Sequence, residues 1–67
     1  MISLTVNGEK RELEGPVRLT AFLETIDVNP RYVAVAHNGT VLQRQRWSEV
    51  VLQDSDVLEI VRMAGGG

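Results

Sequence analysis

Cysteine is absent from the 67 residues of this sequence, and histidine occurs once, as His37. Without cysteine the chain has no disulfide framework and no thiolate for nucleophilic or metal chemistry, and one histidine cannot supply a structural zinc site. The length allows a single domain, because much smaller units bury too little apolar surface to be stable. Apolar packing alone must therefore hold a regular core together.

The sequence also lacks an excess of basic charge and any long apolar run. Seven Lys and Arg against nine Asp and Glu give a net charge of -2, which disfavours binding to nucleic acid. No apolar segment approaches the roughly 20 residues that span a bilayer, so we expect no membrane association. The start of the chain lacks the basic region of a signal peptide, and we expect a cytoplasmic protein.

Alternating side chains predict strands, and a change of period predicts one helix. Residues 2–6 alternate apolar and polar, Asn7-Gly8 is typical of a two-residue hairpin turn, and residues 9–14 return as a polar edge strand. The apolar positions 19, 22, 23 and 26 share one face of a helix, which must end before Pro30. This apolar face of the helix is expected to pack on the sheet.

A second hairpin follows the helix, with a strand around residues 33–36, a turn at Asn38-Gly39 and a return beginning at residues 41–42. Residues 43–49 are expected to form a loop with one short helical turn, residues 54–56 a turn, and residues 57–62 a last strand. The order predicts an α+β fold, with one sheet face covered by the helix. We expect a domain over residues 1–62 and a flexible tail over residues 63–67.

The residues that resemble catalytic groups are better explained as solvated side chains. His37 precedes a turn that would expose it, and the pairs Asp54/Asp56 and Glu12/Glu14 lie on polar turns or an edge strand. No glycine-rich phosphate loop precedes the helix. A ligand pocket of about 300 Å³ or more would hollow out a core of this size, so we expect no catalysis by the chain alone and no resident cofactor or metal.

Trp47 follows Arg44 and Arg46, and an Arg–Trp cluster could stack bases or anchor an interface. Two arginines are a poor nucleic-acid patch. We favour a Trp47 that packs over the open end of the core, with its indole N–H bonded to a carbonyl.

The C-terminal glycines Gly65, Gly66 and Gly67 offer different chemistry. Five residues from Met63 reach at most roughly 17 Å, and glycine makes the segment thin enough to enter a narrow channel. The carboxylate of Gly67 would be ionised and inert until activated. A frayed chain end is the plainer interpretation, but the glycines directly follow a strand in a domain with no other plausible site, which favours a function for them.

The whole chain resembles the sulfur carrier proteins of thiamine biosynthesis, which have a ubiquitin-like β-grasp fold. The resemblance rests on residues 4–8, on residues 30–35 with Asn38-Gly39, on the pattern Val-x-x-Arg-x-x-Trp from Val41, and on residues 56–62 running into the final Gly-Gly. The family tends to have proline, glycine and a Ser or Thr helix cap where this chain has Gln43, Ser55 and Arg18.

The resemblance implies a mixed sheet of four to five strands on one main helix, and a reaction at Gly67. An adenylating enzyme would use ATP and Mg²⁺ to activate the Gly67 carboxylate, and sulfur from a cysteine desulfurase would replace AMP to give a thiocarboxylate. Thiazole synthase would then take up the sulfur. By this resemblance the protein is a stoichiometric carrier rather than an enzyme, and it binds no cofactor of its own.

Partner enzymes are expected to contact the tail and the uncovered sheet face. If Leu58 and Ile60 face the helix, alternation directs the neighbouring residues of the last strand outward. The predicted partner surface comprises Val57, Val61, Met63, Ala34 and Ala36.

Three alternatives remain open on the sequence. The same fold could carry sulfur for molybdopterin synthesis or tRNA thiolation. It could be a ubiquitin-like modifier of other proteins, with Lys10 as the sole lysine for self-attachment. It could also be an interaction module with an incidental tail.

Overall fold

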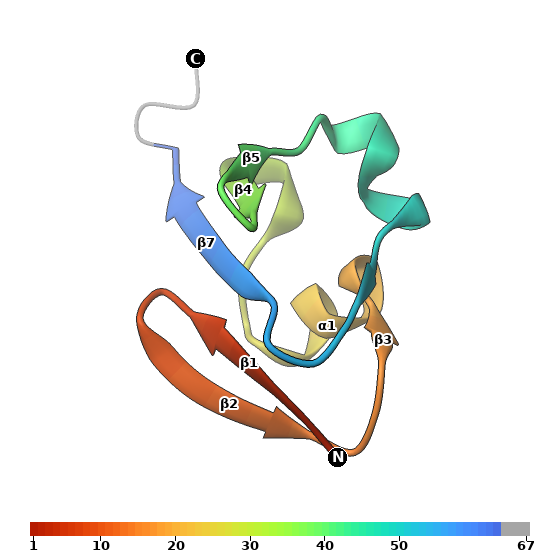
Figure 1. Cartoon of the computed structure of the whole chain (residues 1–67). Helices are drawn as coiled ribbons and strands as arrows, with labels where there is room; N and C mark the ends of the chain where they lie inside the picture. Colours follow the sequence, from red (N-terminus) through yellow and green to blue (C-terminus); the bar gives the residue numbers. More distant parts are fainter. Residues whose placement is uncertain (64–67) are drawn as a thin grey trace.

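A mixed five-stranded sheet and one main helix make up the fold in the computed structural model, which describes residues 1–63 (Figure 1). The strands of this sheet are arranged in the order β2-β1-β7-β4-β5. Their bounds are β1 Ile2–Val6, β2 Glu9–Leu13, β7 Val57–Arg62, β4 Val33–His37 and β5 Thr40–Val41. β1 and β7 are parallel, and the other neighbours are antiparallel. The predicted α+β class and mixed sheet are confirmed.

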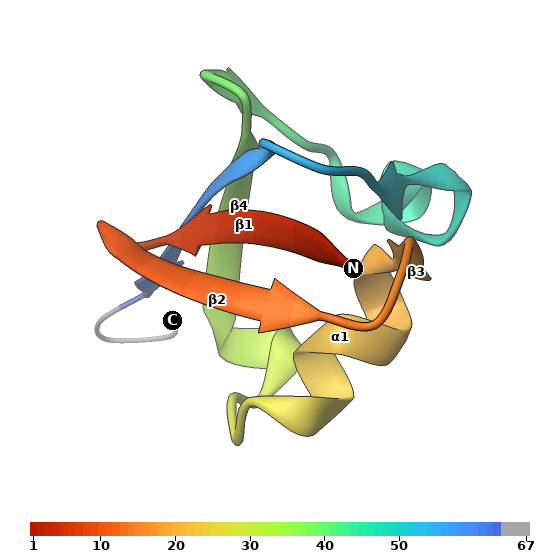
Figure 2. The same cartoon turned by 60° about the horizontal axis from the view of Figure 1, so that its bottom comes forward.

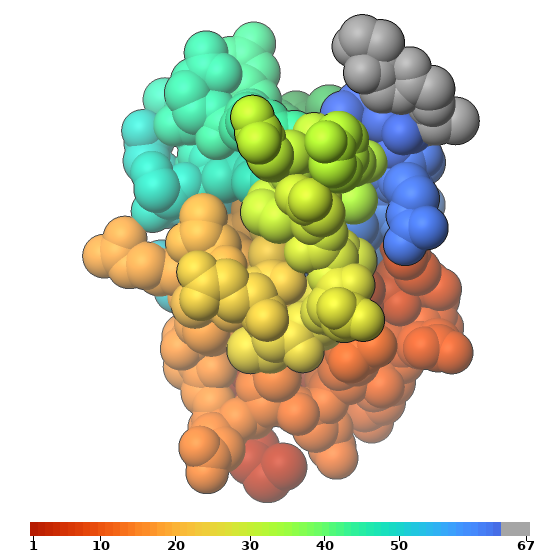
Figure 3. Space-filling model, turned by 180° about the vertical axis from the view of Figure 1, so that it is seen from behind, coloured from red at the N-terminus to blue at the C-terminus, as the bar shows by residue number. Residues whose placement is uncertain are grey.

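The predicted helix is present as α1, Leu19–Thr25, and it covers one face of the sheet (Figure 2). Leu19, Phe22 and Leu23 are buried, as their helical spacing requires, whereas Ile26 is half-buried at the C-terminal cap. Asp27 follows with a φ of 50°, a left-handed conformation that ends the helix well before Pro30. Figure 3 shows the molecule from this side, where α1 and the segment after it form much of the surface.

The core lies between α1 and the inner face of the sheet. Within residues 1–63 all of its buried side chains are apolar, and they come from β1, α1, β4, β7 and the two segments that hold Trp47 and Leu52. They are Ile2, Leu4, Val6, Leu19, Phe22, Leu23, Val33, Val35, Trp47, Leu52, Leu58 and Ile60. Trp47 is 5% exposed and donates its indole N–H to the Leu42 carbonyl at 3.3 Å, which confirms the packing interpretation.

Several short elements differ from the sequence-based expectation. A second ladder, not predicted, joins β3 (Val17–Arg18) to β6 (Val51–Leu52) in antiparallel register. Two 3₁₀ helices are present among the described residues, η1 at Pro30–Tyr32 and η2 at Arg44–Glu49. The second of these is the helical turn expected within residues 43–49. The return strand of the second hairpin is β5 at Thr40–Val41, one residue earlier than expected.

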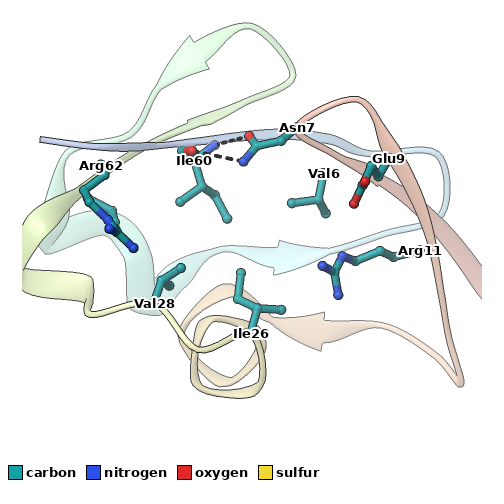
Figure 4. Close-up of a pocket in the computed structure, with 9 residues that line it drawn as sticks. Val6, Asn7, Glu9, Arg11, Ile26, Val28, Ile60 and Arg62 are labelled. Carbon is teal, nitrogen blue, oxygen red and sulfur yellow. Dashed lines mark hydrogen bonds between the residues drawn. The ribbon is translucent and has the colours of Figure 1, made fainter.

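Both hairpin turns attach to the central strand β7. Asn7 and Asn38 adopt φ values of 50° and 51° and are each followed by a glycine of positive φ, as the two-residue turn requires. The Asn7 amide accepts from the Ile60 N–H at 2.7 Å and donates to the Ile60 carbonyl at 3.1 Å (Figure 4). Asn38 accepts from the Val57 N–H at 2.8 Å. These bonds fix the strand that leads toward the C-terminus from both sides.

Candidate functional site

The outer face of the sheet, defined here as the face turned away from α1, carries the predicted partner residues. Burial alternates along β7, so that Val57 and Val61 are 44% and 60% exposed while Leu58 and Ile60 are buried. Ala34 pairs with Val61 across the β4–β7 ladder. Val57, Val61 and Ala34 therefore lie on the same face of the sheet, and their contact with a partner stays a prediction.

The outer face extends further than the sequence indicated. Ala36 pairs with Val41 of β5, and residues paired across a ladder point to the same side. Val41 is 73% exposed, the largest exposure among the valines of this face. On the other flank, Thr5 of β1 pairs with Val57. The alternation of side chains in the second hairpin could have placed Val41 on this face. The position of Thr5 could be found only from the parallel pairing of β1 with β7.

The root of the predicted tail is held by η1, next to the sheet. Met63 is 46% exposed and donates its backbone N–H to the Tyr32 carbonyl at 2.7 Å. Gly65, Gly66 and Gly67, to which we assign the chemistry, lie outside the residues that the structure describes. Their assignment stays a prediction from the sequence.

His37 and Asp56 correct the sequence interpretation, which treated both as solvated. His37 is the last residue of β4, and the β4–β7 register places it opposite Leu58, beside the turn that holds Asp56. Its Nε2 lies 2.8 Å from Asp56 Oδ2, and the two side chains are only 22% and 13% exposed. Asp54 stays exposed but accepts the Ser3 N–H at 2.7 Å. The contacts of Asp56 with His37 and Asn38 join the turn after β4 to the turn before β7.

Asp56 is ionised more readily than an ordinary carboxyl group. Partial burial by itself raises its pKa, but hydrogen bonds from His37, from the Gln53 N–H at 2.9 Å and from Asn38 at 3.1 Å favour the charged form. The net effect is that the pKa of Asp56 lies below its ordinary value. A carboxylate held in this way organises the turn and is poorly suited to accept a proton as a general base.

A surface hollow of about 260 Å³ opens between the first hairpin and the end of α1 (Figure 4). Ile26, Val28 and Ile60 form its apolar part, and Arg11 and Arg62 lie at its border. Its volume is below the roughly 300–1,000 Å³ of typical ligand sites. Within residues 1–63, no three His, Asp or Glu side chains are grouped in the manner of metal ligands.

Arg44 and Trp47 are brought together by the 3₁₀ geometry of η2, in which residues three apart lie on the same side. The Arg44 guanidinium lies 4.7 Å from the centre of the Trp47 ring, within cation–π range. It also donates hydrogen bonds to the carbonyl oxygen of Pro30 in η1 and to that of Val33, the first residue of β4, at 3.3 Å. The pair is therefore part of the folded structure, not a free stacking surface.

The geometry of the chain agrees with a family match that covers nearly all of it. The ThiS family model matches residues 4–67, which include the outer face, the Arg44–Trp47 pair and the terminal glycines. The chain belongs to the ThiS family. A crystal structure of a thiamine biosynthesis protein (ThiS) from Geobacter metallireducens superimposes with a TM-score of 0.86 at 33% identity, covering 98% of this chain and 100% of that one. The predicted β-grasp fold of the family is thereby confirmed.

Relatives of this ThiS family member fall into two size classes. A thiazole synthase from Paramagnetospirillum magneticum is 35% identical over 66 residues, 98% of this chain but 20% of that protein. The chain thus spans about one fifth of that relative's length. The uncharacterized protein ycf40 of Porphyra purpurea is 32% identical over 98% of this chain and 93% of its own length. The ThiS-like region therefore occurs both as a small protein and within a larger one.

No helix within residues 1–63 is long and apolar enough to cross a membrane. The longest, α1, has seven residues.

Proposed function

We propose that this ThiS family member is a sulfur carrier for the thiazole of thiamine, and that the carboxylate of Gly67 is the group that carries the sulfur. The family match over residues 4–67, which includes Gly67, is the observation on which the proposal rests. The structural similarity to a thiamine biosynthesis protein supports the same pathway.

The chemistry needs two displacements, the first at the α-phosphorus of ATP and the second at the Gly67 carbonyl. The carboxylate attacks the α-phosphorus of ATP, pyrophosphate leaves, and the carbonyl now bears AMP as a leaving group that the free carboxylate lacked. Sulfide then attacks this carbonyl and AMP departs, which leaves a thiocarboxylate. ATP and Mg²⁺ are bound by a partner adenylating enzyme, because residues 1–63 contain no phosphate-binding loop before a helix. The protein acts as a co-substrate that is consumed and regenerated.

The outer face is suited to dock such a partner. Val57, Val61 and Val41 expose apolar surface around the small residues Ala34 and Ala36, so that a facing surface can approach the backbone closely. The central strand β7 carries part of this surface and also leads to the C-terminal residues. Docking through this face would bring the tail to the partner's active site.

Thiazole synthase is the proposed acceptor of the sulfur. The support is the match of this chain to a region of the thiazole synthase from Paramagnetospirillum magneticum, since domains joined in one protein often act on one another when separate. A cysteine desulfurase is the proposed source of the sulfur, which a thiol reductant releases from the desulfurase persulfide as sulfide while the thiol is oxidised to a disulfide. We place these steps in the cytoplasm.

Intact-mass measurement tests the proposal. The chain is incubated with its cognate adenylating enzyme, ATP, Mg²⁺ and sulfide, and we expect a mass increase equal to the exchange of one oxygen for sulfur. A chain that lacks Gly66 and Gly67 serves as the control and should not change. Thiazole synthase should then consume the modified chain. An unchanged mass would overturn the sulfur-carrier proposal, and a modified chain that thiazole synthase ignores would assign the carrier to another pathway.

A further inference from the structure

The pattern Val-x-x-Arg-x-x-Trp has no part in the chemistry proposed above, yet Arg44 makes several contacts to distant backbone. Its guanidinium donates to the carbonyl oxygens of Pro30, Arg31 and Val33, the last two at 3.4 and 3.3 Å. A guanidinium can serve several acceptors at once because it has five N–H donors in a fixed plane. Arg44 thus holds the backbone of η1 and the residue after it.

Arg44 donates no hydrogen bond to the carbonyl of Tyr32, which is bonded instead to Met63 at the root of the tail. Tyr32 lies between Arg31 and Val33, and its carbonyl accepts the Met63 N–H at 2.7 Å. The carbonyls of four consecutive residues, 30 to 33, are therefore shared between Arg44 and Met63. Because Arg44 fixes the carbonyls on both sides of Tyr32, it fixes the acceptor that holds Met63.

The Arg44 side chain is itself held in place by a side chain of the core, Trp47. Its guanidinium lies over Trp47, which is 5% exposed and bonded through its indole N–H to the Leu42 carbonyl. An arginine on a rigid aromatic surface loses less freedom when it forms its hydrogen bonds. A continuous series of contacts therefore runs from the buried Trp47, through Arg44 and η1, to Met63.

We propose that Arg44 is a positioning residue that fixes where the C-terminal tail leaves the sheet. Its consequence for the reaction rests on the function proposed above. A carboxylate reacts efficiently only when it is held in line with the phosphorus it attacks, and displacement by about 1 Å can cost up to about 100-fold in rate. A loosened Met63 would spread the tail over more orientations. Arg44 should therefore affect turnover more than docking, which depends on the outer face.

Two arginines of η2 make a matched pair of variants. In Arg44→Gln the contacts to η1 are lost. Arg46→Gln instead changes a side chain that is 66% exposed and whose guanidinium makes a weak contact with Glu49 at 3.5 Å. Arg44→Lys is the second test variant, because it keeps the charge and the stem over Trp47 but cannot serve three carbonyls. It covers the case in which Arg44→Gln does not fold.

Amide hydrogen exchange gives a readout that a general loss of stability would not reproduce. We expect the Met63 amide to exchange about tenfold faster in the Arg44 variants, relative to the amide of Ile60 in β7, which is bonded to Asn7. Arg46→Gln should leave this ratio unchanged. Equal acceleration at Met63 and Ile60, or none at Met63, would overturn the proposal.

Thiocarboxylate formation gives the second readout. With the adenylating enzyme we expect kcat to fall about tenfold in Arg44→Lys, with KM for the carrier nearly unchanged. A higher KM at unchanged kcat would instead make Arg44 a docking residue and overturn the proposed effect on the reaction. If the wild-type chain gains no sulfur at all, the proposed function fails, while the exchange ratio at Met63 still decides whether Arg44 fixes the tail root.

Discussion

Ser55 adopts a backbone conformation that serine disfavours. Its φ is 74°, and the Asp56 N–H donates to the Gln53 carbonyl at 3.2 Å, which makes Ser55 the third residue of a turn that favours glycine there. A left-handed φ costs a non-glycine residue about 1–2 kcal/mol. Glycine removes this cost, but it also gives the unfolded chain more conformational freedom, which reduces the net gain in stability. We expect Ser55→Gly to raise the free energy of unfolding by about 0.5–1 kcal/mol.

Urea unfolding measures this effect. Ser55→Ala is the control, because it removes the hydroxyl, whose contact to Asp54 is 3.5 Å, and keeps the strained φ. The alanine variant should show no gain. Equal stability of the glycine and alanine variants would contradict the explanation by backbone strain.

We expect Asp56 to make the free energy of unfolding depend on pH in the acidic range. Its pKa is lowered in the folded state, so in the unfolded state this carboxyl takes up its proton at a higher pH, about 3.9. The stabilisation is therefore fully present above about pH 5, begins to fall near the unfolded-state pKa, and is lost as the pH falls through the lower folded-state pKa. His37 is the histidine that faces this carboxylate. Asp56→Asn should be less stable near neutral pH and should lose less on acidification.

Asp27→Asn is the matched control for Asp56→Asn. Asp27 is exposed and has a φ of 50°, which asparagine adopts as readily as aspartate. Unfolding midpoints in urea are compared between about pH 6 and pH 2.5, a range that spans the reference carboxyl pKa values. An Asp56→Asn variant with the same acid dependence as the wild type would show that this carboxylate does not contribute.

Strand β7 combines a structural and a predicted recognition role. Its inner residues Leu58 and Ile60 belong to the core, and its outer residues belong to the outer face. We expect Val61→Glu to fold normally, since Val61 is 60% exposed, and to weaken binding to the adenylating enzyme and thiazole synthase about tenfold or more. A buried interface would have to accept an unpaired carboxylate beside Glu59.

Ala21→Glu provides the control for charge. Ala21 is exposed on α1, on the opposite side of the sheet, so the same change in net charge is introduced away from the outer face. Titration calorimetry with each partner gives the affinities. Unchanged affinity and sulfur transfer in Val61→Glu would rule out the outer face as the docking surface.

At the scale of elements, the sequence predicted the turns, the helix and the strands whose patterns depend on residues close together in the chain. The Asn-Gly turns, the helix face of Leu19, Phe22 and Leu23, and the alternation along residues 57–62 each depend on neighbouring residues. The β3–β6 ladder escaped prediction because two-residue strands have no period, and their pairing joins Val17 to Leu52. Alternation could place the outer face before the strand order was known.

Interactions between distant residues could not be predicted. Asparagine in a hairpin turn was expected only for its backbone preference, whereas Asn7 also bonds to Ile60, 53 positions away. The His37–Asp56 contact depends on the register of β4 against β7, which no local pattern specifies. Likewise, the spacing of Arg44 and Trp47 was visible in the sequence, but the carbonyls that Arg44 serves were not.

At the scale of the whole molecule, the core and the proposed reacting group are separate. The buried side chains lie between Ile2 and Ile60 in the sequence, and the outer face is formed by residues of the strands, all of which precede Met63. Folding, docking and chemistry can therefore be altered one at a time. A protein in which the active group lay inside the core would not allow this.

Deletion of Gly66 and Gly67 tests that separation. We expect the free energy of unfolding in urea to change by less than about 0.5 kcal/mol, because no residue of the core is removed. Binding to the adenylating enzyme through the outer face should persist, while intact-mass measurement should show no gain of sulfur. Val61→Glu should give the reverse pattern, with weak binding and slow but measurable gain of sulfur at high enzyme concentration. If the truncated chain still delivered sulfur to thiazole synthase, Gly67 would not be the carrier group. If it lost all binding as well, the tail would supply the docking energy that we assign to the sheet.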